Sequence, residues 1–373
     1  MSAPPWTQVR VDLDAIRHNA RALAGAAGRA RLTAVVKADA YGHGAVPVAR
    51  AALEGGADGL AVVTVDEAEQ LRDAGIDATL LMMGPLAGDE WRRAVECAAE
   101  VTVWTPEAVA AAAAAGGPTR PLRVHLKLDT GMGRLGARPE DVAALTDAAV
   151  AAGTDLRVVG LMTHFASADE TEGENAGFMR EQLLRFRGAT AQLSATFPDA
   201  SVHAANSAAT LRDPATAFDM VRCGIALYGC SPFGGDPADH GLRPAMSWTT
   251  HISAVKTVRS RESVGYGRRW RAARGTRVAT VPVGYADGYS RAFGGRARAL
   301  VGGRPVPVIG AVSMNQLALD LGPEGDAQAG DEVVLLGGQG DERVGAEELA
   351  ALRDTISYEI VCGAAPRAPR RYG

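Results

Sequence analysis

One lysine, Lys37, stands directly after an apolar stretch near the start of the chain. The stretch, "LTAVV" at residues 32–36, is mostly aliphatic and β-branched, which is typical of a parallel strand covered on both faces. Lysine is rarely fully buried unless another group pairs with it or the protein uses its amine. Lys37 therefore either caps the strand and reaches water, or is aimed into a site.

Other polar residues follow other apolar runs in the same way. In chain order they are Lys127, Asp129 and Arg134 in "KLDTGMGRLG", His164 in "THFASADE", Asn206 and Ser207 in "ANSAA", and Arg222 with the backbone of Gly224 and Ile225 in "VRCGIALYG". Lysine, histidine and arginine side chains bind anions and move protons, and serine next to glycine suits a phosphate group. These residues could act together only in a fold that brings the ends of the apolar runs close to one another.

Residues 32–230 alternate short apolar runs with stretches rich in Ala, Glu and Arg. The runs that we expect to be strands are 32–36, 59–64, 78–84, 101–105, 123–128, 157–163, 201–205 and 219–229. Between two of them, "VDEAEQLRDAG" has acids early, Arg72 late and Gly75 as a stop, which predicts a helix. Eight strands with crossover helices predict an α/β fold, a (β/α)8 barrel of the TIM type rather than an open sheet.

The pattern changes after about residue 235. A Pro/Gly-rich linker, "PFGGDPADHGLRP", is followed by β-type runs with glycines between them and little helical signal. These runs are 245–260, 277–284, 304–310, 312–321 and 331–338. We therefore predict two domains, a barrel over residues 1–235 and a mostly antiparallel β domain over 236–373.

In such a barrel the chemistry lies at the C-terminal ends of the strands, and phosphate often binds after the seventh and eighth. The polar residues named above all fall there, and a lysine beside a phosphate site suggests pyridoxal phosphate, whose aldehyde needs an amine. Each residue also has an ordinary interpretation. His164 could be a core histidine, Ser207 a helix N-cap, Lys127 and Arg134 solvated cations, and Arg222 the partner of a carboxylate.

Composition narrows the class of protein. A net charge of −4 gives no reason to expect nucleic acid or an anionic membrane surface as a partner. The alanine tract at 108–117 is too short to span a bilayer, and no secretory signal opens the chain, so we expect a cytoplasmic protein. Four scattered cysteines, Cys97, Cys223, Cys230 and Cys362, indicate reduced thiols and no structural metal site.

Seven motifs carry a family resemblance. "AVVKADAYGHG", "KLDTGMGRLG", "THFASADE", "VRCGIALYG", "VGYADGY", "SMNQ" and "TISYE" occur in order from residue 35 to near the C-terminus. Together they resemble alanine racemase, of the fold type III pyridoxal phosphate enzymes. The lysine motif and "DTGMGR" are individually specific, and the matches span both predicted domains.

The resemblance implies where the cofactor binds. Lys37 would form the Schiff base with pyridoxal 5'-phosphate, His164 would lie by the ring, and Arg222 would face the pyridine nitrogen. The residues implied at the phosphate are Tyr41, Asn206, Ser207, Gly224, Ile225 and Tyr358. An arginine is always charged, so it disfavours a protonated ring nitrogen, weakens the electron sink and suppresses transamination.

The resemblance also implies a two-base mechanism on the external aldimine. Lys37 would act on one face of the substrate's Cα and Tyr266 of the partner subunit on the other, interconverting L- and D-alanine in a head-to-tail homodimer. Arg134 and the backbone of Met314 would orient the substrate carboxylate. Lys127 matches a position that is often carbamylated, which would give an anion that fixes Arg134.

The chain departs from the family pattern in "GAVSMNQ". Ala311 stands where the family usually has an arginine, and Asn315 where it has an aspartate. The residues matching the access corridor are Asp169, Tyr285, Arg291 and Ile356, with Ala311 in the place of the missing cation. The change is either neutral drift or a sign that the preferred amino acid is larger than alanine, or that a broader set is accepted.

Two rival functions are weighed against the racemase. A fold type III pyridoxal phosphate decarboxylase would replace Tyr266 and use a different glycine-rich phosphate pattern. A cofactor carrier built from a single barrel would not need residues 236–373. Neither fits the sequence as well as an amino acid racemase.

Overall fold

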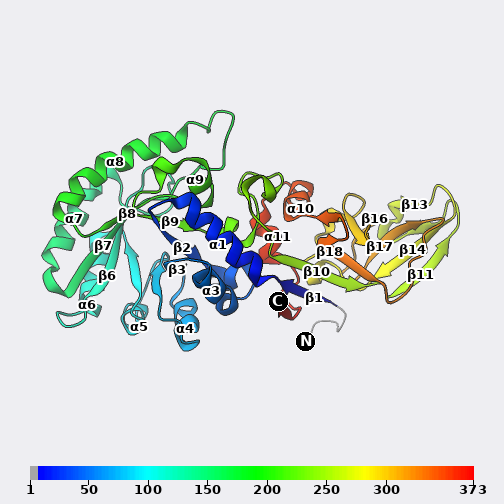
Figure 1. Ribbon diagram of the computed structural model, residues 1–373, viewed down its shortest axis with the longest axis horizontal. Helices are drawn as coiled ribbons and strands as arrows, with labels where there is room; N and C mark the ends of the chain where they lie inside the picture. The colour runs from blue at the N-terminus through cyan, green and yellow to red at the C-terminus, as the bar shows by residue number, and fades with distance from the viewer. Residues whose placement is uncertain (1–6) are drawn as a thin grey trace.

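The computed structural model describes residues 7–373. In its first half, eight parallel strands close into a barrel in the order β2 to β9, which confirms the predicted architecture (Figure 1). The barrel strands are β2 (Arg31–Val35), β3 (Gly59–Val62), β4 (Thr79–Met82), β5 (Glu100–Val103), β6 (Leu122–Lys127), β7 (Leu156–Met162), β8 (Ser201–His203) and β9 (Met220–Cys223). Strand β9 completes the barrel by pairing with β2, with Arg222 opposite Thr33.

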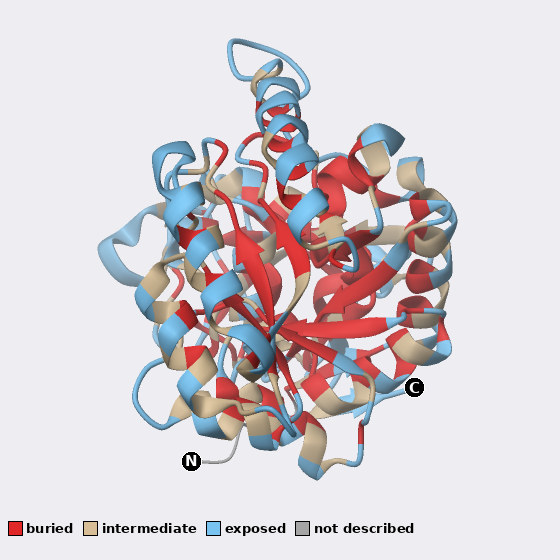
Figure 2. Ribbon diagram, turned by 90° about the vertical axis from the view of Figure 1, so that its left-hand side faces the viewer, coloured by how far each residue is buried: buried red, intermediate tan, exposed pale blue. Residues whose placement is uncertain are grey.

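Helices surround the barrel with one face buried and the other exposed (Figure 2). They are α1 (Leu13–Ala27), α3 (Ala45–Glu54), α4 (Val65–Asp73), α5 (Glu90–Glu96), α6 (Pro106–Ala115), α7 (Val142–Ala151), α8 (Phe178–Thr196) and α9 (Ser207–Arg212). Local sequence starts several of them. At α4, Glu67 N donates to Thr64 Oγ1 and Thr64 N donates to the Glu67 carboxylate, a capping box.

The last predicted barrel strand is too long. The run at 219–229 was expected to be one strand, but β9 ends at Cys223 and a 3₁₀ turn, η4 (Ile225–Tyr228), follows. The backbone leaves the ladder because Gly224 N and Ala226 N donate to Ser207 Oγ, at 2.9 and 3.3 Å. A buried 3₁₀ turn and a buried strand have the same apolar composition, so the sequence pattern did not separate them.

The second half forms a ten-stranded sheet, which confirms the predicted, mostly antiparallel β fold (Figure 1). Its strands are β1 (Gln8–Val11), β10 (Met246–His251), β11 (Ala254–Val258), β14 (Thr276–Val281), β15 (Arg298–Val301), β16 (Arg304–Ile309), β17 (Leu317–Gly322), β18 (Glu332–Gln339), β19 (Glu342–Val344) and β20 (Arg370–Tyr372), and β12 (Ser263–Val264) pairs separately with β13 (Trp270–Arg271). The parallel exception is β1 against β20. The N-terminal strand thus lies in the second sheet, and the domain boundary at residue 235 stays a prediction.

Two helices in this half were not predicted, α10 (Ala346–Arg353) and α11 (Ser357–Gly363). Helix α11 packs against α2 (Lys37–Gly42), directly after the first barrel strand, and so brings the C-terminal half to the barrel mouth. Within residues 7–373, none of the helices combines the length and the apolarity needed to cross a membrane.

Candidate active site

A cavity of about 790 Å³ opens at the C-terminal ends of the barrel strands, where α11 meets the barrel. It brings together residues that lie more than 300 positions apart in the sequence, from Lys37 to Tyr358. The predicted site residues that line it are Lys37, Tyr41, Lys127, Arg134, His164, Asn206, Ser207, Arg222, Gly224, Ile225, Ile356 and Tyr358. The cavity therefore joins most of the predicted cofactor and substrate positions.

Lys37 begins an unusual turn. Residues 38–41 all have left-handed backbone angles, with φ between 51° and 53°. Outside glycine such angles cost roughly 1–2 kcal/mol per residue, and runs of them are rare. Contacts that stabilise the turn include Ala38 N donating to Glu67 Oε1 at 2.6 Å and Ala45 N donating to Asp39 Oδ1 at 2.7 Å. The turn lets Lys37 and Tyr41 line the same cavity.

The Lys37 amine lies in a setting that favours its neutral form. Burial lowers the pKa of Lys37, and the nearby charge of Arg134 lowers it further. A neutral amine is the form that attacks an aldehyde or accepts a proton. The chain has three lysines, and two of them, Lys37 and Lys127, line this cavity.

The cavity floor at β9 is built around Gly224. A Cβ added to this glycine would lie 2.4 Å from the Tyr41 hydroxyl oxygen, so any other residue here would collide with that hydroxyl. Ser207 Oγ faces the same backbone, and Tyr358 lies with its ring centroid 6.0 Å from that of Tyr41. Three hydroxyl groups and a backbone turn thus converge, a donor set that suits a phosphate. Asn206, not Ser207, is the N-cap of α9, through Ala209 N at 3.0 Å.

Arg222 lines the cavity and is buried. Its Nη2 donates to Thr163 O at 2.8 Å and Ala204 O at 3.0 Å, and lies 3.4 Å from His164 Nδ1. Its Nη1 lies 2.7 Å from His203 Nδ1, so its direct contacts are carbonyls and histidines rather than the carboxylate considered above. Burial lowers the pKa of Arg222 to about 10, which still leaves it charged at neutral pH.

His164 and Lys127 also line the cavity and have strongly lowered pKa values. Burial, then Arg222 and Arg134, lowers the pKa of His164 to about 3, so its ring is neutral. Burial and the same two arginines lower the pKa of Lys127 to about 8. Lys127 is therefore not the solvated cation considered above. Arg134 is exposed yet lines the cavity, at the end of a turn in which Gly131 N and Gly133 N donate to Asp129 Oδ1.

Apart from Asp169, the remaining predicted residues lie on the β domain, and they do not line this cavity. Side chains of Tyr266, Met314 and Tyr285 are 75%, 56% and 43% exposed. Arg291 and Ala311 line a separate hollow beside Trp270, and the loop of Tyr266 passes next to Ala311. In one chain the predicted site is thus divided between the barrel mouth and a set of residues on the β domain. We call this set, Tyr266, Tyr285, Arg291, Ala311 and Met314, the exposed group.

Asp169 and Ile356 lie on the barrel side of that division. Ile356 lines the cavity and is 57% exposed. Asp169 lies near Tyr358, and its charge adds to the effect of burial in raising the pKa of the Tyr358 hydroxyl. The five corridor positions therefore do not meet within one chain.

Family models match nearly the whole chain. Residues 11–232 match the alanine racemase N-terminal domain, and residues 245–372 match the alanine racemase C-terminal domain. The chain belongs to the alanine racemase family. The resemblance given by the seven motifs is thereby confirmed.

Individual relatives agree along their full length. The alanine racemase of Symbiobacterium thermophilum is 44% identical over 372 residues, covering 99% of this chain and 97% of the relative. The alanine racemase of Frankia casuarinae is 43% identical over 370 residues, covering 97% and 95%. Both are named for an isomerase activity.

Solved structures share the fold. The alanine racemase of D-cycloserine-producing Streptomyces lavendulae superposes with a TM-score of 0.92 at 43% identity, covering 100% of this chain and 98% of that one. The alanine racemase of Bacillus anthracis with bound L-Ala-P superposes with a TM-score of 0.86 at 36% identity, covering 100% and 96%.

Several lining residues of this family member were not predicted. They include Met83, Leu135, Glu359 and Cys362. Glu359 and Cys362 lie on α11, which the sequence analysis missed as a helix. A helical reading of "SYEIVCG" would have placed residues 358, 359 and 362 on one side, because neighbours three and four apart share a helix face.

Proposed function

We propose that this protein is a pyridoxal phosphate-dependent racemase that interconverts L-alanine and D-alanine. The single observation that carries the proposal is the barrel-mouth cavity, which gathers Lys37, His164, Arg222 and the three hydroxyl groups of the Gly224 floor. Membership of the alanine racemase family supports the same reaction.

The cavity suits the cofactor. Lys37 provides an amine with a lowered pKa, and Tyr41, Ser207 and Tyr358 provide hydroxyl donors around the Gly224 backbone. The lack of a side chain at Gly224 lets the Tyr41 hydroxyl approach the backbone there, so this hydroxyl and Ser207 Oγ lie together at the cavity floor. Asn206 supports this floor by capping α9, and Ile225 continues it.

When bound, pyridoxal phosphate supplies the aldehyde that takes up the amino group and the ring that withdraws electrons from Cα. The protein's part is to orient and to move protons. Arg134 and the backbone of the partner's Met314 hold the substrate carboxylate. Lys37 removes or returns the Cα proton on one face, and Tyr266 of the partner subunit does so on the other.

Arg222 sets the selectivity between reactions. Its guanidinium is still charged at neutral pH and would lie toward the ring nitrogen of the cofactor, where it would disfavour a second positive charge. A ring that withdraws electrons less strongly would favour proton transfer at Cα over transamination.

The division of the predicted site supports a homodimer. Tyr266 and Met314 are large apolar or aromatic residues that are more than half exposed in one chain. A head-to-tail partner would place them over the other subunit's cavity, and the partner's Tyr266 would complete the two-base pair. The four unpaired cysteines support a reducing, cytoplasmic setting.

Lys127 is proposed to carry a carbamate. A carbamate forms on a neutral amine, and the pKa of about 8 makes that form accessible near neutral pH. The resulting anion would pair with Arg134 and orient it toward the substrate carboxylate. Growth in ¹³C-bicarbonate followed by ¹³C NMR should show a carbamate carbon that is lost in Lys127→Met. An unchanged spectrum in the variant contradicts the assignment.

The test of the function is Cα proton exchange in deuterium oxide. L-amino acids are incubated with the enzyme and added cofactor, and NMR follows deuterium at Cα while a chiral assay follows inversion. Exchange with inversion, fastest for alanine, is the expected result. Fast exchange only with larger amino acids would keep the racemase chemistry and make Ala311 and Asn315 the specificity positions. The absence of exchange with every amino acid would overturn the two-base mechanism.

A further inference from the structure

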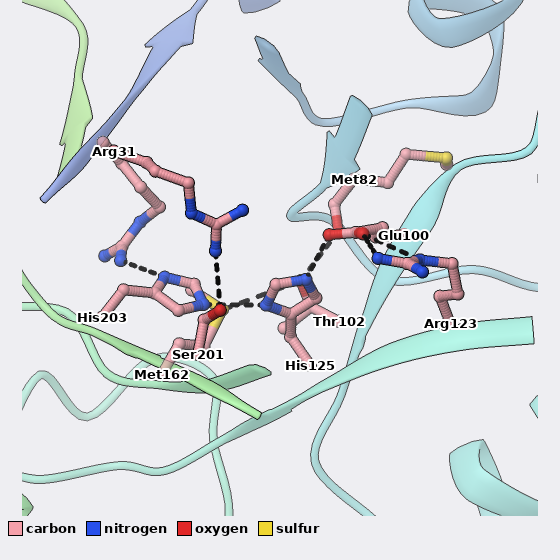
Figure 3. A network of polar contacts seen from close by, with 10 residues as sticks. Arg31, Met82, Glu100, Thr102, Arg123, His125, Met162, Ser201 and His203 are labelled. Carbon is pink, nitrogen blue, oxygen red and sulfur yellow. Dashed lines mark hydrogen bonds and ion pairs between the residues drawn. The ribbon is translucent and has the colours of Figure 1, made fainter. Parts of the chain in front are cut away.

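A buried chain of hydrogen bonds crosses the inside of the barrel. It runs from Glu100 on β5 through His125 on β6 to His203 on β8 (Figure 3). From His203 it continues to Arg222 on β9, and we call these four residues the relay. His125 Nε2 lies 2.8 Å from Glu100 Oε2, and His125 Nδ1 lies 2.8 Å from His203 Nε2. His203 Nδ1 lies 2.7 Å from Arg222 Nη1. All four residues are buried.

The two ends of the relay determine where its protons are. A guanidinium only donates hydrogen bonds, so His203 Nδ1 must accept from Arg222. His203 then carries its proton on Nε2 and donates to His125 Nδ1. His125 in turn carries its proton on Nε2 and donates to Glu100, because its Nδ1 is already an acceptor. Both rings are neutral Nε2–H tautomers, and all donors point the same way.

Charges at the far end support this direction. Burial alone would raise the pKa of Glu100, but hydrogen bonds from His125 and Arg123 outweigh it and bring the pKa to about 2. Arg123 donates to Glu100 Oε1 through Nε and Nη2. Burial, then the charge of Arg222, lowers the pKa of His203 well below its ordinary value. A carboxylate held ionised accepts only, as the relay requires.

Strand β7 leaves a gap that the relay needs. It runs between β6 and β8, with Gly160 opposite both His125 and Ser201. A Cβ on residue 160 would lie 1.9 Å from His125 Nδ1, the atom that meets His203. The β6–β7 register shifts between Val124 and His125, which places Gly160 rather than Val159 opposite the histidine.

We propose that Glu100, His125 and His203 are positioning residues for Arg222, holding its guanidinium charged and in one orientation toward the cavity through two fixed imidazole tautomers. The part that concerns the cofactor rests on the proposed function, in which Arg222 faces the ring nitrogen. The tautomers themselves do not depend on it. In general the partner of one imidazole nitrogen decides which nitrogen is protonated, and here two imidazoles pass that choice from Arg222 to Glu100.

The first measurement is of the tautomers. Holoenzyme labelled with ¹⁵N-histidine is studied by long-range ¹H–¹⁵N NMR, with His125→Gln and His203→Gln as assignment variants. We expect both rings to show the Nε2–H pattern. An Nδ1–H tautomer or a doubly protonated ring at residue 125 or 203 in the unmodified protein overturns the proposal.

The second measurement compares side reactions. In Glu100→Gln a neutral amide replaces the ionised acceptor, so the hydrogen bond that anchors the His125 ring is weakened, while Arg222 still fixes the direction of the donors. In Gly160→Ala a methyl group displaces the His125 ring. Both should raise pyruvate release, in which the amino group stays on the cofactor, relative to racemisation by about tenfold, as loss of an outer-shell partner typically does. Glu100→Gln should keep the Nε2–H tautomers, because the guanidinium of Arg222 fixes them.

The matched controls change the same chemistry elsewhere. Glu69→Gln alters a carboxylate that pairs with Arg93 on the surface of α4 and α5. Gly188→Ala adds a methyl group to α8 where no atom lies within 4 Å. Both should behave as the unmodified protein does. If Glu100→Gln is folded and leaves the pyruvate ratio unchanged, the relay has no positioning role. If the unmodified protein racemises no amino acid, the proposed function fails while the NMR result still decides the relay.

Discussion

The barrel mouth and the exposed group on the β domain hold the two halves of one predicted site, and they differ in burial. At the barrel mouth, Ser207 and Arg222 are 2% and 3% exposed and held by several hydrogen bonds each. On the β domain, Tyr266 is 75% exposed. A rigid, buried half can bind and orient a cofactor within one chain. The other half gains neighbours only when a second chain covers it.

The largest expected effect is at Lys37. Lys37→Ala removes both the amine that holds the cofactor and one base, so racemisation should fall by about 10⁴-fold or more. The measurement is chiral chromatography of alanine at saturating substrate. Lys256→Ala, an exposed lysine on β11, is the control and should keep full activity.

The same three lysines allow a direct chemical check. Borohydride reduction followed by mass spectrometry of peptides should find the cofactor on Lys37 alone, since the chain offers only Lys37, Lys127 and Lys256. Label on Lys127 or Lys256 instead would mean that the barrel-mouth assignment is wrong.

The second prediction concerns which chain supplies Tyr266. Lys37→Ala and Tyr266→Phe are each expected to be nearly inactive as homodimers. After the two are unfolded together and refolded, half of the dimers should be mixed, and one of the two sites in each should have both bases intact. Activity should then recover to about one quarter of that of the unmodified protein, as C2 symmetry requires.

Recovery in that mixture needs the tyrosine to act across the interface. If Tyr266 served its own subunit, every site in a mixed dimer would lack one base and no activity would return. The unmodified protein, unfolded and refolded in the same way, is the control for refolding losses.

The third prediction concerns the pH dependence of stability that the burial of Lys127 at the barrel mouth should cause. Lys127 loses its proton near pH 8 in the folded protein and near its ordinary pKa of 10.5 when unfolded. Between these values the unfolded chain binds more protons, so stability rises with pH through that window. In buffer free of carbon dioxide, Lys127→Met should therefore exceed the unmodified protein in Tm most below pH 8, and the difference should shrink toward pH 10.5.

Lys256→Met, at an exposed site, is the matched control and should show no such trend. A Tm difference for Lys127→Met that stays constant from pH 7 to beyond 10.5 would mean that the buried amine does not titrate as described.

The smallest expected effect is at Ala311 in the exposed group. Ala311→Arg restores the cation that the family usually has, beside Arg291 in the hollow that both line. If this position sets substrate size, kcat/KM for alanine relative to larger amino acids should change by about tenfold. Ala311→Met adds similar length without charge and separates the two effects. Unchanged preference in both variants leaves Ala311 as neutral drift.

The outline of the barrel could be predicted because each of its elements has a local signal. Apolar β-branched runs such as 32–36 are long enough to identify a buried strand, and capping residues such as Thr64 and Glu67 mark helix starts. The elements that were missed have weak local signals. Helix α11 has seven residues, and the end of β9 depends on Ser207, which lies 17 positions away.

The relay shows why inward-facing polar residues were hard to interpret. "RVHLKL" and "SVHAA" each put a histidine inside an apolar strand, which signals a buried polar group but not its partner. The partner is on another strand, and the contact exists only because Gly160 on the strand between has no side chain. This gap depends on how the three strands β6, β7 and β8 are aligned, so the sequence of one strand alone does not reveal it.

By itself the sequence determined the two fold types, the family and the residue types available for chemistry. Periodicity and motifs are patterns of residues that are neighbours in the sequence, so they can be recognised without the tertiary structure. Only the tertiary structure decided that Lys37 enters through a left-handed turn, that Arg222 contacts a histidine rather than a carboxylate, and that Tyr266 lies away from the cavity in its own chain. Those outcomes depend on long-range contacts and on burial. Burial also decides which titratable side chains are charged and which are neutral at a given pH, because desolvation shifts the pKa of a side chain only where the fold has removed the surrounding water.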